Sequence, residues 1–193
     1  MNEMKKILLI CSVASGLFLG ALGAGAQDLS AIEERKLELD ELFSELQSPE
    51  VSNPHRIEQQ IYFIWSQSGS ASADLLLERG QEAIEAADYG AAIEHLTALT
   101  DHAPDFAEGW NARATAFFLH GEYGLALVDI RRALALNPRH FGALSGLAFI
   151  LDETGDAENA LLVYEQVNQL HPYLDNVGEA IQRLTDATKG TAL

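Results

Sequence analysis

Residues 107–140 read AEGWNARATAFFLHGEYGLALVDIRRALALNPRH, and the fold can be predicted from the pattern of this segment. Its first half places large and small apolar residues, such as Trp110 and Ala114, on one stripe at helical spacing. A Gly-Glu-Tyr turn at residues 121–123 follows, and a second apolar stripe then runs to a proline, which cannot continue a helix. The pattern predicts a helical hairpin with small residues where its two helices approach each other.

The same pattern occurs three times in the chain. Prolines recur at 34-residue intervals, and the segments before them align without a gap as units 73–106, 107–140 and 141–174. In each unit a large apolar residue of the first helix is followed four positions later by a small one. These pairs are Leu76 and Gly80, Trp110 and Ala114, and Leu144 and Ala148. Residues 73–174 are therefore predicted to form three hairpins of one kind.

These units resemble the tetratricopeptide repeat. The residues of the middle unit that match this family's pattern are Trp110, Ala114, Phe117, Gly121, Tyr123, Ala126, Ile130, Ala133 and Pro138. Arg113 replaces a usual leucine, Ala87 a usual glycine, and Ala157 a usual aromatic residue. The resemblance implies an all-α fold, a right-handed α-solenoid of tetratricopeptide-like helix-turn-helix repeats, with a concave face for protein partners.

Residues 1–26 have the pattern of a signal peptide. Two lysines precede an apolar stretch at 7–22 that is short for a membrane span, and the small residues at 24–26 suit a signal peptidase. We expect a mature chain that begins at Gln27 and is exported to the periplasm; an uncleaved anchor is the alternative. The only cysteine, Cys11, lies in this leader. No second apolar run of membrane length follows, so no stable membrane insertion is expected after cleavage.

The charge balance excludes one class of partner. The chain carries 12 Lys and Arg residues against 29 Asp and Glu residues, a net charge of −17. This argues against nucleic-acid binding, which depends on cationic contacts to phosphate, and favours a basic partner. The histidines are too scattered to share a metal ion, and no nucleophile elbow or phosphate-binding loop occurs. We expect no catalytic residues, no metal and no cofactor.

Two flanking segments accompany the repeats. Residues 27–70 predict a helical hairpin whose second helix carries Ile57, Ile61 and Trp65 on one face. We interpret this hairpin either as a degenerate repeat that caps the amino end of the array or as a surface for self-association. Residues 175–193 predict a C-terminal capping helix and a tail.

Two arginines stand where leucine is usual in the family. Because an unpaired buried charge is costly, each is expected to form an ion pair with the opposing helix. Arg113 would pair with Asp129, and Arg79 with Glu94 or His95.

The first helices of the three units are expected to line the concave groove. The predicted groove residues are Leu77, Gln81, Glu85, Glu108, Asn111, Thr115, Phe118, Phe149 and Asp152. We expect the asparagine and the two phenylalanines of this set to anchor an extended peptide, and its three acids to steer basic residues. Alternatively, the flanking helices cover the groove.

These observations predict a noncatalytic periplasmic adaptor in envelope assembly, which binds a short basic and apolar segment of a protein partner. The alternative is a structural homo-oligomer assembled through the N-terminal hairpin, with the repeats as a spacer. Repeat domains that clamp the tails of heat-shock chaperones place Lys, Arg and Asn in this groove. Most of those positions are occupied here by Leu77, Ala112, Gly142 and Gly146, which disfavours such a partner.

Overall fold

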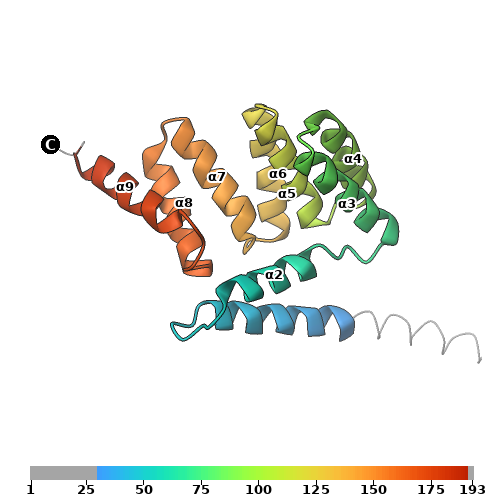
Figure 1. Cartoon of the computed structure of the whole chain (residues 1–193), viewed down its shortest axis with the longest axis horizontal. Helices are drawn as coiled ribbons and strands as arrows, with labels where there is room; N and C mark the ends of the chain where they lie inside the picture. Colours follow the sequence, from blue (N-terminus) through green and yellow to red (C-terminus); the bar gives the residue numbers. More distant parts are fainter. Residues whose placement is uncertain (1–29, 191–193) are drawn as a thin grey trace, which may run out of the picture. The chain divides into compact units, whose positions relative to one another are not determined.

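The computed structural model describes residues 30–190, which consist of helices joined by turns (Figure 1). The predicted signal peptide, residues 1–26, lies outside the described residues. The chain divides into two compact units, Met1–Glu41 and Leu42–Leu193. The described part of the first unit is helical, in a helix that spans residues 30–46, and the second unit holds the repeats.

Six helices of the second unit form three consecutive hairpins, so the predicted all-α repeat fold is confirmed. The hairpins are α3 (Ala71–Glu85) with α4 (Tyr89–His102), α5 (Ala107–Leu119) with α6 (Tyr123–Leu136), and α7 (Phe141–Glu153) with α8 (Ala157–Leu170). Helix α5 contacts α3 on one side and α7 on the other. The first helices of the hairpins are therefore neighbours in space, although each is separated from the next by a whole helix in the sequence (Figure 1).

Each hairpin turns at a residue with a left-handed backbone. Gly121 and Gly155 have φ angles of 88° and 85°, which glycine adopts without steric cost. Ala87 occupies the same position in the first hairpin with a φ of 57°, where its Cβ crowds the following carbonyl. The side chains of Asp88 and Asp156 then accept hydrogen bonds of 3.1 and 3.4 Å from backbone N–H groups of the next helix. The turn position is thus set by local sequence in every unit.

Small residues let the two helices of a hairpin approach closely. Leu96 of α4 lies so near Gly80 of α3 that a Cβ added to the glycine would come within 2.5 Å of the leucine side chain. Ala114 and Ala148, at the equivalent positions, are both buried. The alternation of large and small residues in the sequence is therefore the pattern of interhelical packing.

Helix α2 (Pro54–Trp65) packs near the start of the third repeat. This helix and the segment before it supply rings to a buried cluster around the start of α7. This aromatic cluster consists of Phe43, Tyr62, Trp65, His140, Phe141 and His171. Trp65 stacks on the His140 ring with centroids 4.3 Å apart, and Phe141 is fully buried. The cluster fixes α2 to the edge of the array.

This packing corrects both interpretations of the N-terminal hairpin. The rings of α2 contact His140 and Phe141, at the junction of the second and third repeats, so α2 does not cap the amino end of the array as predicted. Ile57 and Ile61 are fully buried and Trp65 is covered by His140, so the face predicted for self-association is occupied by the chain itself. The sequence showed that this apolar face must be buried. It did not show which residues cover the face, because the covering residues lie far from α2 along the chain.

Helix α9 (Val177–Gly190) packs on α8 through the buried side chains of Val177 and Leu184. It thereby covers the side of the last hairpin that has no further repeat beside it. Among the described helices, none has both the length and the apolar character needed to cross a membrane.

Candidate functional site

A groove runs over the first helices of the three hairpins, and its first part lies between α3 and α5. This part, which we name the acidic hollow, has a volume of about 380 Å³. Its lining residues are Gln81, Ile84, Glu85, Glu108, Asn111, Ala112 and Thr115. The lining combines carboxylates, amides and a hydroxyl with no Lys or Arg. The acidic hollow therefore suits a cation or a hydrogen-bond donor.

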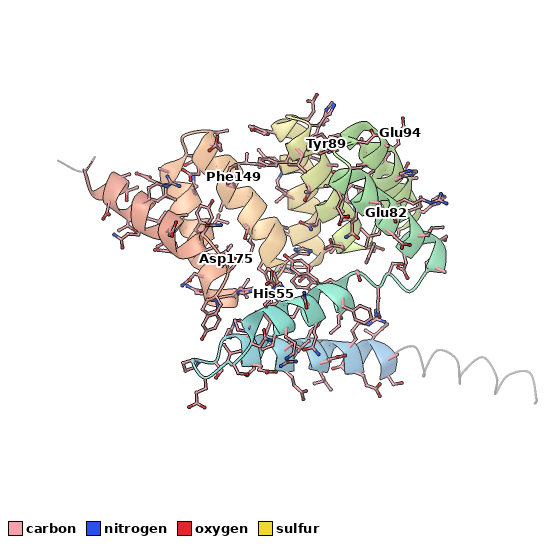
Figure 2. All side chains as sticks on the ribbon, in the orientation of Figure 1. His55, Glu82, Tyr89, Glu94, Phe149 and Asp175 are labelled. Atoms are coloured by element: carbon pink, nitrogen blue, oxygen red, sulfur yellow. The ribbon has the colours of Figure 1, made fainter. Side chains whose placement is uncertain are left out.

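The next part of the groove, the aromatic hollow, lies between α5 and α7. Phe118, Ser145, Gly146 and Phe149 line a volume of about 240 Å³. The rings of Phe118 and Phe149 meet edge to face with centroids 5.4 Å apart, and Phe118 stacks on Tyr123 at 5.3 Å. Phe149, labelled on α7 in Figure 2, is 44% exposed. A partly exposed aromatic pair of this kind can hold an apolar side chain.

The two hollows form one continuous path. A smaller cavity of about 70 Å³ lies between them. Asn111 and Thr115 border both this cavity and the acidic hollow, whereas Phe118 and Gly146 border both the cavity and the aromatic hollow. A bound segment could therefore contact both hollows at once.

Helix α9 contributes to the far end of the groove, where a hollow of about 470 Å³ includes Phe149, Asp152, Tyr164 and Arg183 in its lining. Two guanidinium N–H groups of Arg183 donate to the two carboxylate oxygens of Asp152. Burial, and next the Asp152 charge, raise the pKa of Tyr164. Asp152 thus has an ion-pair partner within its own chain, which weakens its expected role in steering a basic ligand.

Eight of the nine predicted groove residues line these hollows, and Leu77 does not. Leu77 is 2% exposed and belongs to a core cluster with Leu96 and Ala112, so its prediction as a groove residue is wrong. The cause is α5, which packs beside α3 and covers this position. Glu108 lines the acidic hollow but is 7% exposed and hydrogen-bonded to His140, so its predicted role as a free steering charge is also wrong.

Sequence reasoning missed the buried residues beneath the groove. His140 is fully buried, and its Nε2 lies 2.7 Å from Oε2 of Glu108. Tyr62 of α2 reaches Gly142, where an added Cβ would lie 2.9 Å from the tyrosine hydroxyl. Burial raises the pKa of Tyr62 above its usual range, with a smaller contribution from the Glu108 charge. No local pattern could have indicated these contacts, because they depend on how α7 lies beside α5 and on where α2 docks.

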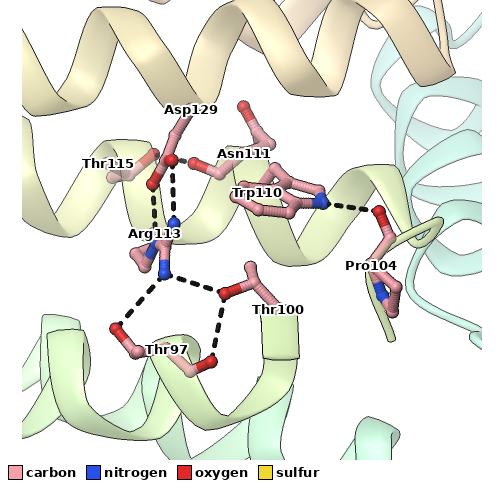
Figure 3. A network of polar contacts seen from close by, with 8 residues as sticks. All are labelled: Thr97, Thr100, Pro104, Trp110, Asn111, Arg113, Thr115 and Asp129. Atoms are coloured by element: carbon pink, nitrogen blue, oxygen red, sulfur yellow. Dashed lines mark hydrogen bonds and ion pairs between the residues drawn. The ribbon is translucent and has the colours of Figure 1, made fainter. Parts of the chain in front are cut away.

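The predicted ion pair between Arg113 and Asp129 is confirmed (Figure 3). Nε and Nη2 of Arg113 donate to the two carboxylate oxygens at 2.7 and 2.9 Å, and Nη1 donates to the hydroxyls of Thr97 and Thr100. Arg79 is exposed and forms no ion pair within residues 30–190, so its predicted pairing is wrong. The first repeat has His95 at the position that Asp129 occupies in the second, so no carboxylate stands opposite Arg79 there.

The fold and the groove define a helical-repeat protein with an open groove of acidic and aromatic residues. Across the described part of the chain, no group of three or more His, Cys, Asp and Glu side chains is placed to hold a metal ion.

Comparisons with known proteins assign the family. A tetratricopeptide repeat family model matches residues 77–130. A TPR repeat-containing protein of Rhizobium etli is 35% identical over 162 residues, which cover 83% of this chain and 79% of that protein. The small glutamine-rich tetratricopeptide repeat-containing protein 2 of Saccharomyces cerevisiae is 31% identical over 119 residues, or 62% of this chain and 34% of that protein. This chain belongs to the tetratricopeptide repeat family.

A solved structure agrees with this assignment. The first TPR of Spaghetti (RPAP3), bound to the HSP90 peptide SRMEEVD, superposes with a TM-score of 0.59 at 26% sequence identity. The match covers 62% of this chain and 95% of that domain.

Proposed function

We propose that this protein is a noncatalytic periplasmic adaptor in envelope assembly, which binds a short segment of a protein partner in the groove over α3, α5 and α7. The observation that carries the proposal is the junction of the acidic and aromatic hollows into one path. No reactive group is needed for this role, because the groove offers shape, charge and an apolar anchor site.

The spacing of the two hollows defines the segment they would hold. Packed helices lie roughly 8–10 Å apart, and an extended chain advances about 3.3 Å per residue. A Lys or Arg over the acidic hollow would therefore stand about three residues from an apolar side chain over the aromatic hollow. The partner segment is thus an extended chain that carries a basic residue and an apolar residue about three positions apart.

The charge of the groove separates this protein from its structural neighbour. The peptide bound to Spaghetti, SRMEEVD, carries three acidic residues and one basic residue. The acidic and aromatic hollows contain no Lys or Arg in their linings, and exposed Glu85 would repel such a peptide. We therefore propose a basic partner rather than an acidic chaperone tail.

Photo-crosslinking in cells tests the groove. A photoreactive residue replaces exposed Thr115, and mass spectrometry identifies the crosslinked segment. Glu85→Lys with Phe149→Ala should abolish the crosslink, because the change reverses a groove charge and removes the aromatic wall. Glu158→Lys with Leu162→Ala makes a matched change on the exposed side of α8 and should keep the crosslink.

A crosslink that persists in the groove variant, or that disappears equally in the control, would show that partners bind elsewhere. A captured segment without a basic residue near an apolar one would refute the proposed partner chemistry. The periplasmic location has its own test: fractionation of cells that produce the full chain should release a mature form whose first residue is Gln27.

A further inference from the structure

A chain of hydrogen-bonded side chains runs from His140, next to the start of α7, through Glu108 to Asn111 on the groove floor. The Glu108 carboxylate lies between two side chains, with Oε2 2.7 Å from Nε2 of His140 and both oxygens 3.4 Å from Nδ2 of Asn111. His140 is fully buried, whereas Asn111 is half-buried and borders both the acidic hollow and the central cavity. Asn111 is thus the residue through which this series of hydrogen bonds reaches the groove.

The hydrogen of His140 has a defined position. Nδ1 accepts a hydrogen bond of 3.2 Å from the backbone N–H of Ala143 and so caps the start of α7. A ring nitrogen that accepts carries no hydrogen, so the ring hydrogen resides on Nε2 and is donated to Glu108. Trp65 stacks on the imidazole, with a 23° angle between the rings, and holds it in this orientation.

The amide of Asn111 then has one orientation. An ionised carboxylate accepts hydrogen bonds and donates none, so Glu108 requires the NH₂ group of Asn111 to face it. The amide cannot turn over without placing its carbonyl oxygen against a carboxylate. Oδ1 of Asn111 is therefore the atom left for a ligand in the groove.

We infer that Asn111 determines specificity in the groove as a fixed hydrogen-bond acceptor, with Glu108, His140 and Trp65 as the residues that position it. A partner must present an N–H donor at this point, from a Lys or Arg side chain or from its backbone. The statement about the partner rests on the proposed function, whereas the orientation of the amide does not. This is a second reason, independent of net charge, for the groove to select donors over carboxylates.

Glu108→Gln tests the orientation with little change of shape. The new side chain can still accept from Nε2 of His140 through its carbonyl oxygen, which directs its own NH₂ group toward Asn111. Only Oδ1 of Asn111 can accept from that group, so the Asn111 amide should turn and present its NH₂ to the groove. Glu85→Gln removes the same charge from the exposed side of the acidic hollow and serves as the matched control.

Nuclear magnetic resonance of the unliganded protein reads the amide directly. Hydrogen exchange of the Asn111 side-chain NH₂ should be at least about tenfold slower in the wild type than in Glu108→Gln, because a hydrogen bond to a charged acceptor protects it. Glu85→Gln should match the wild type. Equal exchange in all three proteins would overturn the inference, provided that helical circular dichroism shows all three folded.

A peptide library reads the selectivity. The probe is a set of blocked nonapeptides with one fixed Phe and random residues elsewhere. The wild type should enrich Lys or Arg over Asp or Glu about three residues from the Phe, and Asn111→Ala should reduce that preference about tenfold. Glu108→Gln should lose more of the preference than Glu85→Gln, although both lose one charge.

An equal loss in the two glutamine variants would assign the selectivity to charge alone and overturn the role of Asn111. If the wild type enriches no peptide, the proposed groove function is refuted, and so is the inference that a partner presents an N–H donor to Asn111. The exchange measurement still decides the amide orientation in that case, so the two failures are distinguishable.

Discussion

Gly80→Ala tests whether close helix approach determines the packing of the first hairpin. The added Cβ would lie 2.5 Å from two side-chain atoms of Leu96 and 3.0 Å from a third, whereas carbon atoms in contact lie about 3.5–4.0 Å apart. Leu96 is fully buried and must move within a filled core. Overpacking costs about 1–3 kcal/mol, and we place this site in the upper half of that range. Alanine favours the helix by about 1 kcal/mol over glycine, so the net loss of stability is about 1–2 kcal/mol.

Urea and thermal unfolding, followed by helical circular dichroism, measure this change. The Tm should fall by about 2–8 °C for a chain of this size. Gly146→Ala in α7 is the matched control, because its Cβ would make an ordinary contact of 3.5 Å with Ile130. This control should gain about 0.5–1 kcal/mol from helix propensity. If both alanine variants are stabilised alike, the tight packing of α3 against α4 is not a constraint and the reasoning is refuted.

Three further substitutions test single interactions by the same unfolding measurements. Ala87→Gly should stabilise the protein by about 0.5–1 kcal/mol, because glycine relieves the left-handed strain at the first turn. Asp129→Asn should cost about 3 kcal/mol, because it leaves the Arg113 charge buried without its carboxylate. Burial lowers the pKa of His171, and the Glu58 charge opposes this only in part. The unfolded chain therefore binds this proton near pH 6.5 and the folded chain only at lower pH, so stability should fall as the pH drops below about 6.5. His171→Leu should remove that fall.

Each of these substitutions has a control. A loss of stability in Ala87→Gly would contradict the strain argument. Asp105→Asn breaks the exposed pair with Arg132 and should cost less than about 1 kcal/mol, so an equal cost at Asp129 would refute the burial argument. Exposed His120→Leu should keep the wild-type pH dependence, and a dependence that survives in His171→Leu would have to come from other groups, such as the nearby Asp175 carboxylate.

Most of the groove could be predicted from the sequence, because the register of a helical repeat fixes which face each residue occupies. Gln81, Thr115 and Phe149 line the hollows where their spacing placed them. The errors occurred where a neighbouring element changes the environment of a residue without changing its register. Leu77 has the helical register of a groove residue, but α5 covers it. Glu108 has the same register, but its carboxylate is hydrogen-bonded to His140.

The hairpins, their turns and their small contact residues follow from local sequence, because helix periodicity, left-handed turn residues and prolines act over a few positions along the chain. The docking site of α2, the acids that remain free for a ligand and the orientation of the Asn111 amide depend instead on tertiary packing. Those outcomes depend on residues such as Trp65 and His140, which lie far apart in the chain and meet only after the repeats have stacked. Their contact energies are set by burial and hydrogen-bond geometry, which no linear pattern encodes.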